Sequence, residues 1–183
     1  MSDATNKVVY KPVGVAGLIT PWNLPLYLLS WKVAPALLMG NTVVAKPSEM
    51  TPMTASLLAE VMEEVGLPNG VFNLVHGNGL DSGAPLTSHP DVDLVSFTGG
   101  TETGRQVAKS ASSGFKKLSL ELGGKNATII RADADLETMM PNIVRASFLN
   151  QGQVCLCGSR ILIDETIYDT FVEAFLESVS DMI

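Results

Sequence analysis

Short apolar runs alternate with longer segments of helical periodicity along most of the chain. Five runs have the length and composition of strands, at residues 12–20, 41–47, 70–77, 92–100 and 115–124. Helices are predicted in the segments between them, at 24–39, 51–66, 80–88 and 101–112. Because the strand runs are apolar without alternation, they indicate strands covered on both faces. The pattern therefore predicts an α/β fold with a parallel sheet and helices on both of its faces.

Two of these helices carry enough apolar residues to predict how they pack. The longest apolar stretch, "LPLYLLSWKVAPALLMG" at 24–40, is interrupted by Lys32 and Pro35 and is too short to cross a membrane, so it predicts a buried helix. In the next helix, one buried face is predicted to consist of Leu57, Leu58, Val61, Met62 and Val65.

The pattern changes after Gly123 and Gly124. "NATIIR" predicts a strand, "DLETMMPNIVRASFLN" a helix, and "SRILIDETIYDTFVEAFLESVSDMI" a further strand and helix. We therefore predict a domain boundary here, with one domain at 1–123 and a second at 124–183. About 60 residues with so few elements rarely form an independent core, so the second domain is predicted to be incomplete.

Composition narrows the class of protein. The 183 residues are 46% hydrophobic and only 17% charged, against about a quarter charged in typical soluble domains. We expect some of this apolar surface to be covered by further chain or by another subunit. The net charge of −7 and the lack of a Lys/Arg cluster argue against nucleic acid as a partner. Backbone amides can still bind an anionic cofactor in an acidic protein.

The cysteines and the start of the chain bear on its compartment. Two cysteines separated by one residue are too few for a disulfide framework, and with two histidines they give no zinc-ligand spacing. The polar opening "MSDATNKVVY" predicts no signal peptide. These features predict a cytoplasmic protein without a metal or a membrane partner.

One cysteine lies in an unusual setting. Cys155 is in the middle of "FLNQGQVCLCGSR", a polar turn with glycines, whereas free cysteines are usually found in apolar cores. It is either a half-buried structural thiol or a nucleophile. A nucleophile would need three helpers elsewhere: a hydrogen-bond donor to the oxyanion, a base, and a group that accepts what leaves.

Polar residues follow several strands, where ligands of α/β sheets bind. The glycines of "HGNGLDSG" (76–83) and "FTGGTETG" (97–104) let backbone approach a phosphate, although plain turns are the more common reason for such glycines. Lys46 and Glu49 in "AKPSE" could hold ribose hydroxyls, and a carboxylate there would repel a 2′-phosphate and favour NAD over NADP. The alternative is a solvated pair in a loop.

Two more residues could support a nucleophile. Asn23 in "ITPWNLP" could donate to an oxyanion, or it could make an ordinary turn or helix cap. Glu121 in "LELGG" ends an apolar strand, where its charged form should be disfavoured, as suits a general base. It could equally be a glutamate that points into solvent.

Together, these motifs carry a family resemblance. "PWNLP", "VVAKPSE", "FTGGTETG", "LELGGKN" and "NQGQVCLCGSR", in this order and with these gaps, resemble the NAD(P)-dependent aldehyde dehydrogenase superfamily from about Val13 to the C-terminus. The segments "NLPLYLLSWKVAPALL" and "QVCLCGSR" are similar to sequences of the branch that oxidises 2-aminomuconic and 2-hydroxymuconic semialdehydes. The resemblance implies a Rossmann-like NAD-binding domain followed by the start of a second, catalytic α/β domain.

The resemblance also implies roles for individual residues. Cys155 matches the catalytic cysteine and Glu121 the general base, while Asn23 and the backbone N–H of Cys155 match the oxyanion hole; Cys157 receives no catalytic role. The resemblance implies NAD as the cofactor, bound by Ile19, Thr20, Pro21, Trp22, Lys46, Ser48, Glu49, Gly79, Gly83, Phe97, Thr98, Gly99, Gly100 and Leu122.

Compared with the family's pattern, the chain is short. We therefore expect a fragment with little or no turnover of its own, from an enzyme that acts on a small aldehyde and forms a homo-oligomer. Two alternatives remain open. One is a non-catalytic module for NAD binding or subunit contact, which would bind NAD without oxidising aldehydes. The other is a cysteine esterase whose activity survives removal of NAD.

Overall fold

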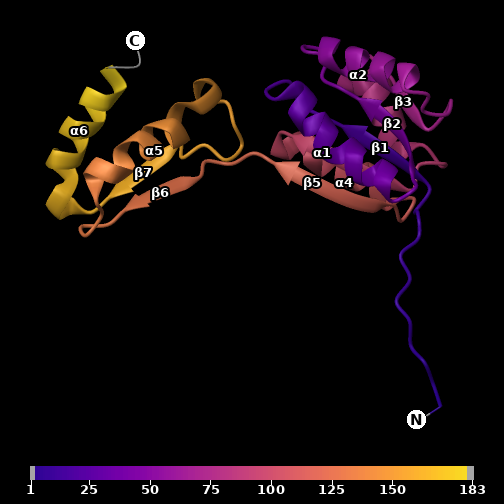
Figure 1. The fold of residues 1–183 in the computed structure, drawn as a ribbon, viewed down its shortest axis with the longest axis horizontal. Coiled ribbons are helices and arrows are strands. Elements are labelled where there is room, and N and C mark those ends of the chain that lie inside the picture. The colour runs from indigo at the N-terminus through magenta and orange to yellow at the C-terminus, as the bar shows by residue number, and fades with distance from the viewer. Residues whose placement is uncertain (1–2, 181–183) are drawn as a thin grey trace. The chain divides into compact units, whose positions relative to one another are not determined.

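A computed structural model describes residues 3–180 of the chain. They form two compact units, the first ending at Leu122 and the second beginning at Gly123. Each unit has its own sheet and its own apolar core, so the two are described separately (Figure 1).

Unit 1 contains a sheet of five parallel strands in the order β3-β2-β1-β4-β5. The strands are β1 (Val15–Ile19), β2 (Thr42–Lys46), β3 (Phe72–Leu74), β4 (Leu94–Gly99) and β5 (Lys117–Leu122). The helices are α1 (Pro25–Leu38), α2 (Met53–Glu64), α3 (Ala84–Ser88) and α4 (Thr101–Ser112), with a π-helical turn at Gly79–Gly83. This is the Rossmann-like arrangement predicted from the sequence.

Alternate residues of the strands pack into two apolar cores, one on each face of the sheet. On one face, α1 and α2 cover Ala16, Leu18, Val43 and Ala45, and Leu29 of α1 is fully buried there. On the other face, the cluster that α3 and α4 cover consists of Ile19, Leu86, Val92, Val95, Phe97, Val107 and Ala111. The two helix layers thus fix the sheet from both sides, as Figure 1 shows for unit 1.

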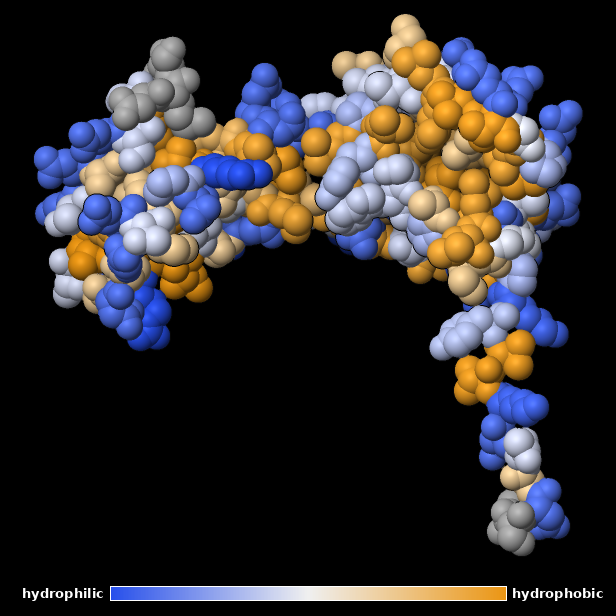
Figure 2. Space-filling view, in the orientation of Figure 1, coloured by the Kyte–Doolittle hydropathy of each residue, from blue (hydrophilic) through white to orange (hydrophobic). Residues whose placement is uncertain are grey.

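The predicted burial of the first two helices is wrong in part. Helix α1 buries only Leu29 and Val33, while Trp31 and Leu38 are 63% and 86% exposed. Figure 2 shows apolar residues at the surface of this unit. A single helix packed on a sheet buries one stripe, so a helix that is apolar all round exposes the remainder.

In α2 the stripe that packs on the core is Ala55, Leu58 and Met62, at i, i+3 and i+7. Leu57, Val61 and Val65 form the neighbouring stripe and are exposed, which corrects the single apolar face predicted for them. Strand β5, at one edge of the sheet, is likewise not covered on both faces, since Lys117, Leu118 and Ser119 are all exposed.

Unit 2 is one βαβ unit with a further helix. Parallel strands β6 (Ala127–Ile130) and β7 (Arg160–Ile163) are joined through α5 (Leu136–Phe148), and α6 (Tyr168–Ser180) follows. Asp135 caps α5 by accepting from the Thr138 N–H at 3.2 Å. The core forms around Phe171, which is 1% exposed and stacks on Phe175 with ring centroids 5.6 Å apart. None of the helices in the described part of the chain is long and apolar enough to cross a membrane.

Candidate functional site

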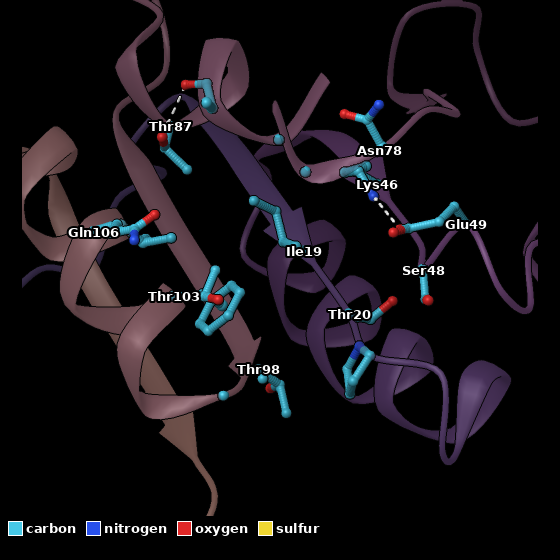
Figure 3. Close-up of a pocket in the computed structure, with 18 of the residues that line it drawn as sticks. Ile19, Thr20, Lys46, Ser48, Glu49, Asn78, Thr87, Thr98, Thr103 and Gln106 are labelled. Carbon is cyan, nitrogen blue, oxygen red and sulfur yellow. Dashed lines mark hydrogen bonds and ion pairs between the residues drawn. The ribbon is translucent and has the colours of Figure 1, made fainter. Parts of the chain in front are cut away.

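The polar residues that follow the strands of unit 1 meet at the carboxyl end of its sheet. Ile19 pairs with Lys46 on one side and with Phe97 on the other, so β1, β2 and β4 end at the same level. The chain builds from β1 toward β3 and then returns to place β4 on the other side of β1. The loops after β1 and β4 therefore diverge, and ligands of doubly wound sheets bind at such a point. A cleft of about 600 Å³ opens there (Figure 3).

All but one of the residues assigned to the cofactor line this cleft. The lining residues that the sequence predicted are Ile19, Thr20, Pro21, Trp22, Lys46, Ser48, Glu49, Gly79, Gly83, Phe97, Thr98, Gly99 and Gly100. Leu122 is not among them, because its side chain lies against Gly104 of α4. The cleft thus gathers residues that are up to 91 positions apart in the sequence, from Ile19 to Ser110.

Sequence reasoning missed the helical wall of the cleft. Thr103, Gln106, Val107 and Ser110 of α4 line it, at spacings of three, four and seven residues. Thr87 of α3 also lines it and donates from its hydroxyl to that of Ser110 at 3.0 Å (Figure 3). The polar residues Thr103, Gln106 and Ser110 recur at helical spacing, and this was the signal that could have found them.

Lys46 and Glu49 form the charged part of the cleft. Lys46 is 3% exposed, and its ammonium donates to the Pro47 carbonyl at 3.0 Å and lies 3.4 Å from the Glu49 carboxylate (Figure 3). A hydrogen bond from its own backbone N–H, assisted by the Lys46 ammonium, lowers the pKa of Glu49. The Glu49 side chain is 54% exposed. It is therefore an ionised acceptor that a ligand can reach.

Other groups in the cleft fit a dinucleotide. The Thr20 hydroxyl is buried, and no described group bonds to it, so a polar ligand atom would satisfy it. A Cβ at Gly79 or Gly100 would meet nothing within 4 Å, which leaves room for backbone to approach a ligand. Helix α4 begins at the cleft, and its N-cap is Gly100. No side chain caps the N–H groups of the first turn, so they can bind a phosphate. The volume is within the usual range of ligand sites, roughly 300–1,000 Å³.

Asn23 and Glu121 also belong to unit 1. Asn23 is half-buried in the loop between β1 and α1, just beyond the lining residue Trp22. Glu121 is exposed near the end of edge strand β5, a less apolar setting than the sequence predicted. Burial lowers the pKa of Lys32, whose ammonium donates to the Ser96 hydroxyl at 2.7 Å, and the negative charge of Glu121 opposes this shift.

Cys155 belongs to unit 2, in the loop between α5 and β7. It is exposed, whereas Cys157 is 4% exposed and lies with its sulfur 3.9 Å from the Leu149 carbonyl oxygen. Just before the cysteines, Asn150 and Gln151 have φ of 52° and 60°. Such left-handed backbone is costly for residues with side chains, and it is concentrated at functional loops.

The strand order and the cleft define unit 1 as a nucleotide-binding type of α/β unit. The model of the aldehyde dehydrogenase family matches residues 1–183. The chain therefore belongs to the aldehyde dehydrogenase family.

Curated relatives support the same family. The chain is 56% identical over 173 residues to a 2-aminomuconic semialdehyde dehydrogenase of Danio rerio, covering 94% of this chain and 36% of the relative. It is 51% identical over 170 residues to a betaine aldehyde dehydrogenase of Bacillus subtilis, covering 93% and 35%. The chain thus spans about a third of the length of these relatives.

Solved structures agree in fold. A betaine aldehyde dehydrogenase of Staphylococcus aureus in complex with NAD+ superposes with a TM-score of 0.90 at 48% identity, covering 93% of this chain and 34% of that one. An aldehyde dehydrogenase of Bartonella henselae gives a TM-score of 0.90 at 46% identity, covering 93% and 36%.

Proposed function

We propose that this chain contributes the NAD-binding and nucleophilic parts of an enzyme that oxidises an aldehyde to the carboxylic acid. The observation that carries the proposal is the cleft of unit 1, where the buried Lys46 ammonium and the ionised Glu49 carboxylate lie beside the ends of the central strands. The structure of the Staphylococcus aureus relative in complex with NAD+ supports the choice of cofactor.

Each cofactor-binding residue has a physical task in this proposal. Glu49 would accept hydrogen bonds from ribose hydroxyls, and Lys46 would hold the carboxylate in place and donate to a ribose oxygen. The Thr20 hydroxyl would bond to a polar atom of the ligand. The backbone near Gly100, at the start of α4, would face the pyrophosphate.

We assign the chemistry to three residues on the family resemblance. The thiolate of Cys155 would add to the aldehyde carbon, and Asn23 would donate to the oxyanion that forms. Bound NAD would supply the acceptor for the hydride that this adduct loses. Glu121 would take a proton from the water that hydrolyses the resulting thioester, which frees the acid and the thiol.

For the substrate, we propose a semialdehyde of the muconic type. Several of the most similar curated relatives act on 2-aminomuconic or 2-hydroxymuconic semialdehyde, at 52–56% identity. The betaine aldehyde relative is nearly as similar, at 51% identity, so assays with both substrate types would decide between them. We expect the 183 residues alone to turn over slowly or not at all.

Replacing Glu49 by glutamine should change the preference between NAD and NADP. The variant loses a charged acceptor for the ribose hydroxyls and no longer repels a 2′-phosphate, so the ratio of the two dissociation constants should shift toward NADP by about 10- to 100-fold. Calorimetric titration of both cofactors measures the ratio. Glu63→Gln, an exposed change on α2 outside the cleft, is the control. A ratio that stays within about twofold of the unmodified chain contradicts the role of Glu49.

A further inference from the structure

The loop that carries Cys155 is held by one side chain from the neighbouring strand. Asn126 lies immediately before β6, and its amide nitrogen donates to the carbonyl of Cys155 at 2.5 Å and to that of Cys157 at 3.2 Å. A side-chain amide has two N–H donors, so both can be used at once. One residue thereby fixes the peptide units that follow Cys155 and Cys157.

Asn126 is itself held firmly in place. Its backbone carbonyl accepts from the Arg160 N–H at 3.1 Å, and Ala127 pairs with Arg160 in the parallel ladder between β6 and β7. The Arg160 side chain also donates to the Lys125 carbonyl at 2.9 Å. The side-chain amide of Asn126 is therefore attached to backbone that the sheet holds rigidly. A residue that positions another group needs such rigid support.

The turn that Asn126 holds includes the backbone on both sides of Cys155. The Val154 carbonyl accepts from the Cys157 N–H at 3.0 Å, which closes a turn over Cys155 and Leu156. That carbonyl belongs to the same peptide unit as the N–H of Cys155, so the turn fixes the direction of this N–H. Of the two bonds from Asn126, one fixes the Cys155–Leu156 peptide unit inside this turn, and the other fixes the Cys157–Gly158 unit that follows it.

The remaining contacts of the loop show how closely it is fitted to β6. A Cβ at Gly158 would collide with the hydroxyl of Thr128. The left-handed residues Asn150 and Gln151 precede the turn, and such strained backbone persists only where surrounding contacts hold it.

We propose that Asn126 is a positioning residue for the nucleophile: it holds the Val154–Cys157 turn so that the Cys155 N–H is directed at the oxyanion that forms on Cys155. This inference rests on the proposed role of Cys155. It concerns unit 2 alone, and no bound cofactor is needed to test it.

The test compares two reactions of Cys155 in the 183-residue chain. With p-nitrophenyl acetate, the thiolate attacks the ester carbonyl, a sulfur–carbon bond forms, and p-nitrophenolate leaves with the electron pair of the broken carbon–oxygen bond. This step passes through an oxyanion. Alkylation by iodoacetamide is a direct displacement of iodide and does not, so only acylation depends on a directed N–H.

Asn126→Asp keeps the shape of the side chain and removes both donors. Asn126 is exposed, so the core of unit 2 should be unchanged, and circular dichroism melting checks this. We expect acylation of Cys155 to slow by about tenfold while alkylation changes by less than about twofold. Asn126→Ser, with one donor, should give an intermediate rate. Ser159→Ala is the matched control, because the Ser159 hydroxyl reaches the Cys157 carbonyl at 3.3 Å but not that of Cys155.

A second measurement tests the turn without using a reactive cysteine. Amide hydrogen exchange at residues 154–158 should be about tenfold faster in Asn126→Asp. Unchanged exchange, or an equal slowing of acylation and alkylation, overturns the positioning role of Asn126. If exchange is faster in Asn126→Asp but the chain without substitutions is not acylated at all, the assignment of Cys155 as the nucleophile is overturned instead.

Discussion

Cys155→Ala should abolish the covalent acyl adduct that p-nitrophenyl acetate leaves on the chain. Cys155 is exposed in a constrained loop, and only its thiolate can add to a carbonyl there. Without the sulfur, the adduct found by intact-mass spectrometry should fall to the background of surface lysines, a loss of at least about a hundredfold in rate. Peptide mapping of the acylated chain without the substitution should place the adduct at residue 155.

Cys157→Ala is the matched control for this experiment. Cys157 is 4% exposed and cannot meet the reagent, so its removal should leave the adduct at Cys155 in place. The variant loses a small buried side chain and should be less stable by about 1 kcal/mol. If the adduct persists in Cys155→Ala, or maps to Cys157, Cys155 is not the nucleophile of this chain.

Phe171→Ala should unfold unit 2. The ring is 1% exposed at the centre of that core and stacks on Phe175, and truncating such a ring costs about 3 to 5 kcal/mol. A unit of this size has little stability to lose. We expect far-UV circular dichroism to show the loss of unit 2. The fluorescence of Trp22 and Trp31, both in unit 1, should melt as before.

The control for this substitution lies on the same helix. Leu176 is 59% exposed, so Leu176→Ala should change the unfolding free energy by less than about 0.5 kcal/mol. A tryptophan transition that shifts together with the circular dichroism in Phe171→Ala would contradict separate cores in the two units. Unchanged melting by both methods would contradict the central place of Phe171.

The sequence was sufficient to predict the parallel sheet and the grouping of the strand-end residues. Apolar runs separated by helical periods define βαβ units, and the topology then brings their carboxyl ends to one edge. Lys46 and the glycines of residues 97–104 could be placed at this end of the sheet from their positions after strands, whereas Thr20 was assigned there by the family resemblance. The fold and family predictions are confirmed, whereas the roles of Cys155, Glu121 and Asn23 stay predictions.

Packing could not be predicted in the same way. Helices α1 and α2 are apolar around more than one stripe, so periodicity alone could not determine which stripe faces the sheet. The bonds of Asn126 to the cysteine loop join residues 29 and 31 positions apart, and they depend on the register between β6 and β7. A contact of that kind leaves no periodic signal in the sequence.

The most direct test of the central claim is a calorimetric titration of NAD into the 183-residue chain. If the cleft of unit 1 is the cofactor site, NAD should bind saturably at one molecule per chain with a dissociation constant below about 1 mM, and ADP-ribose, which keeps both phosphates and both riboses, should displace it. A folded chain that shows no saturable binding of NAD up to about 5 mM would contradict the account.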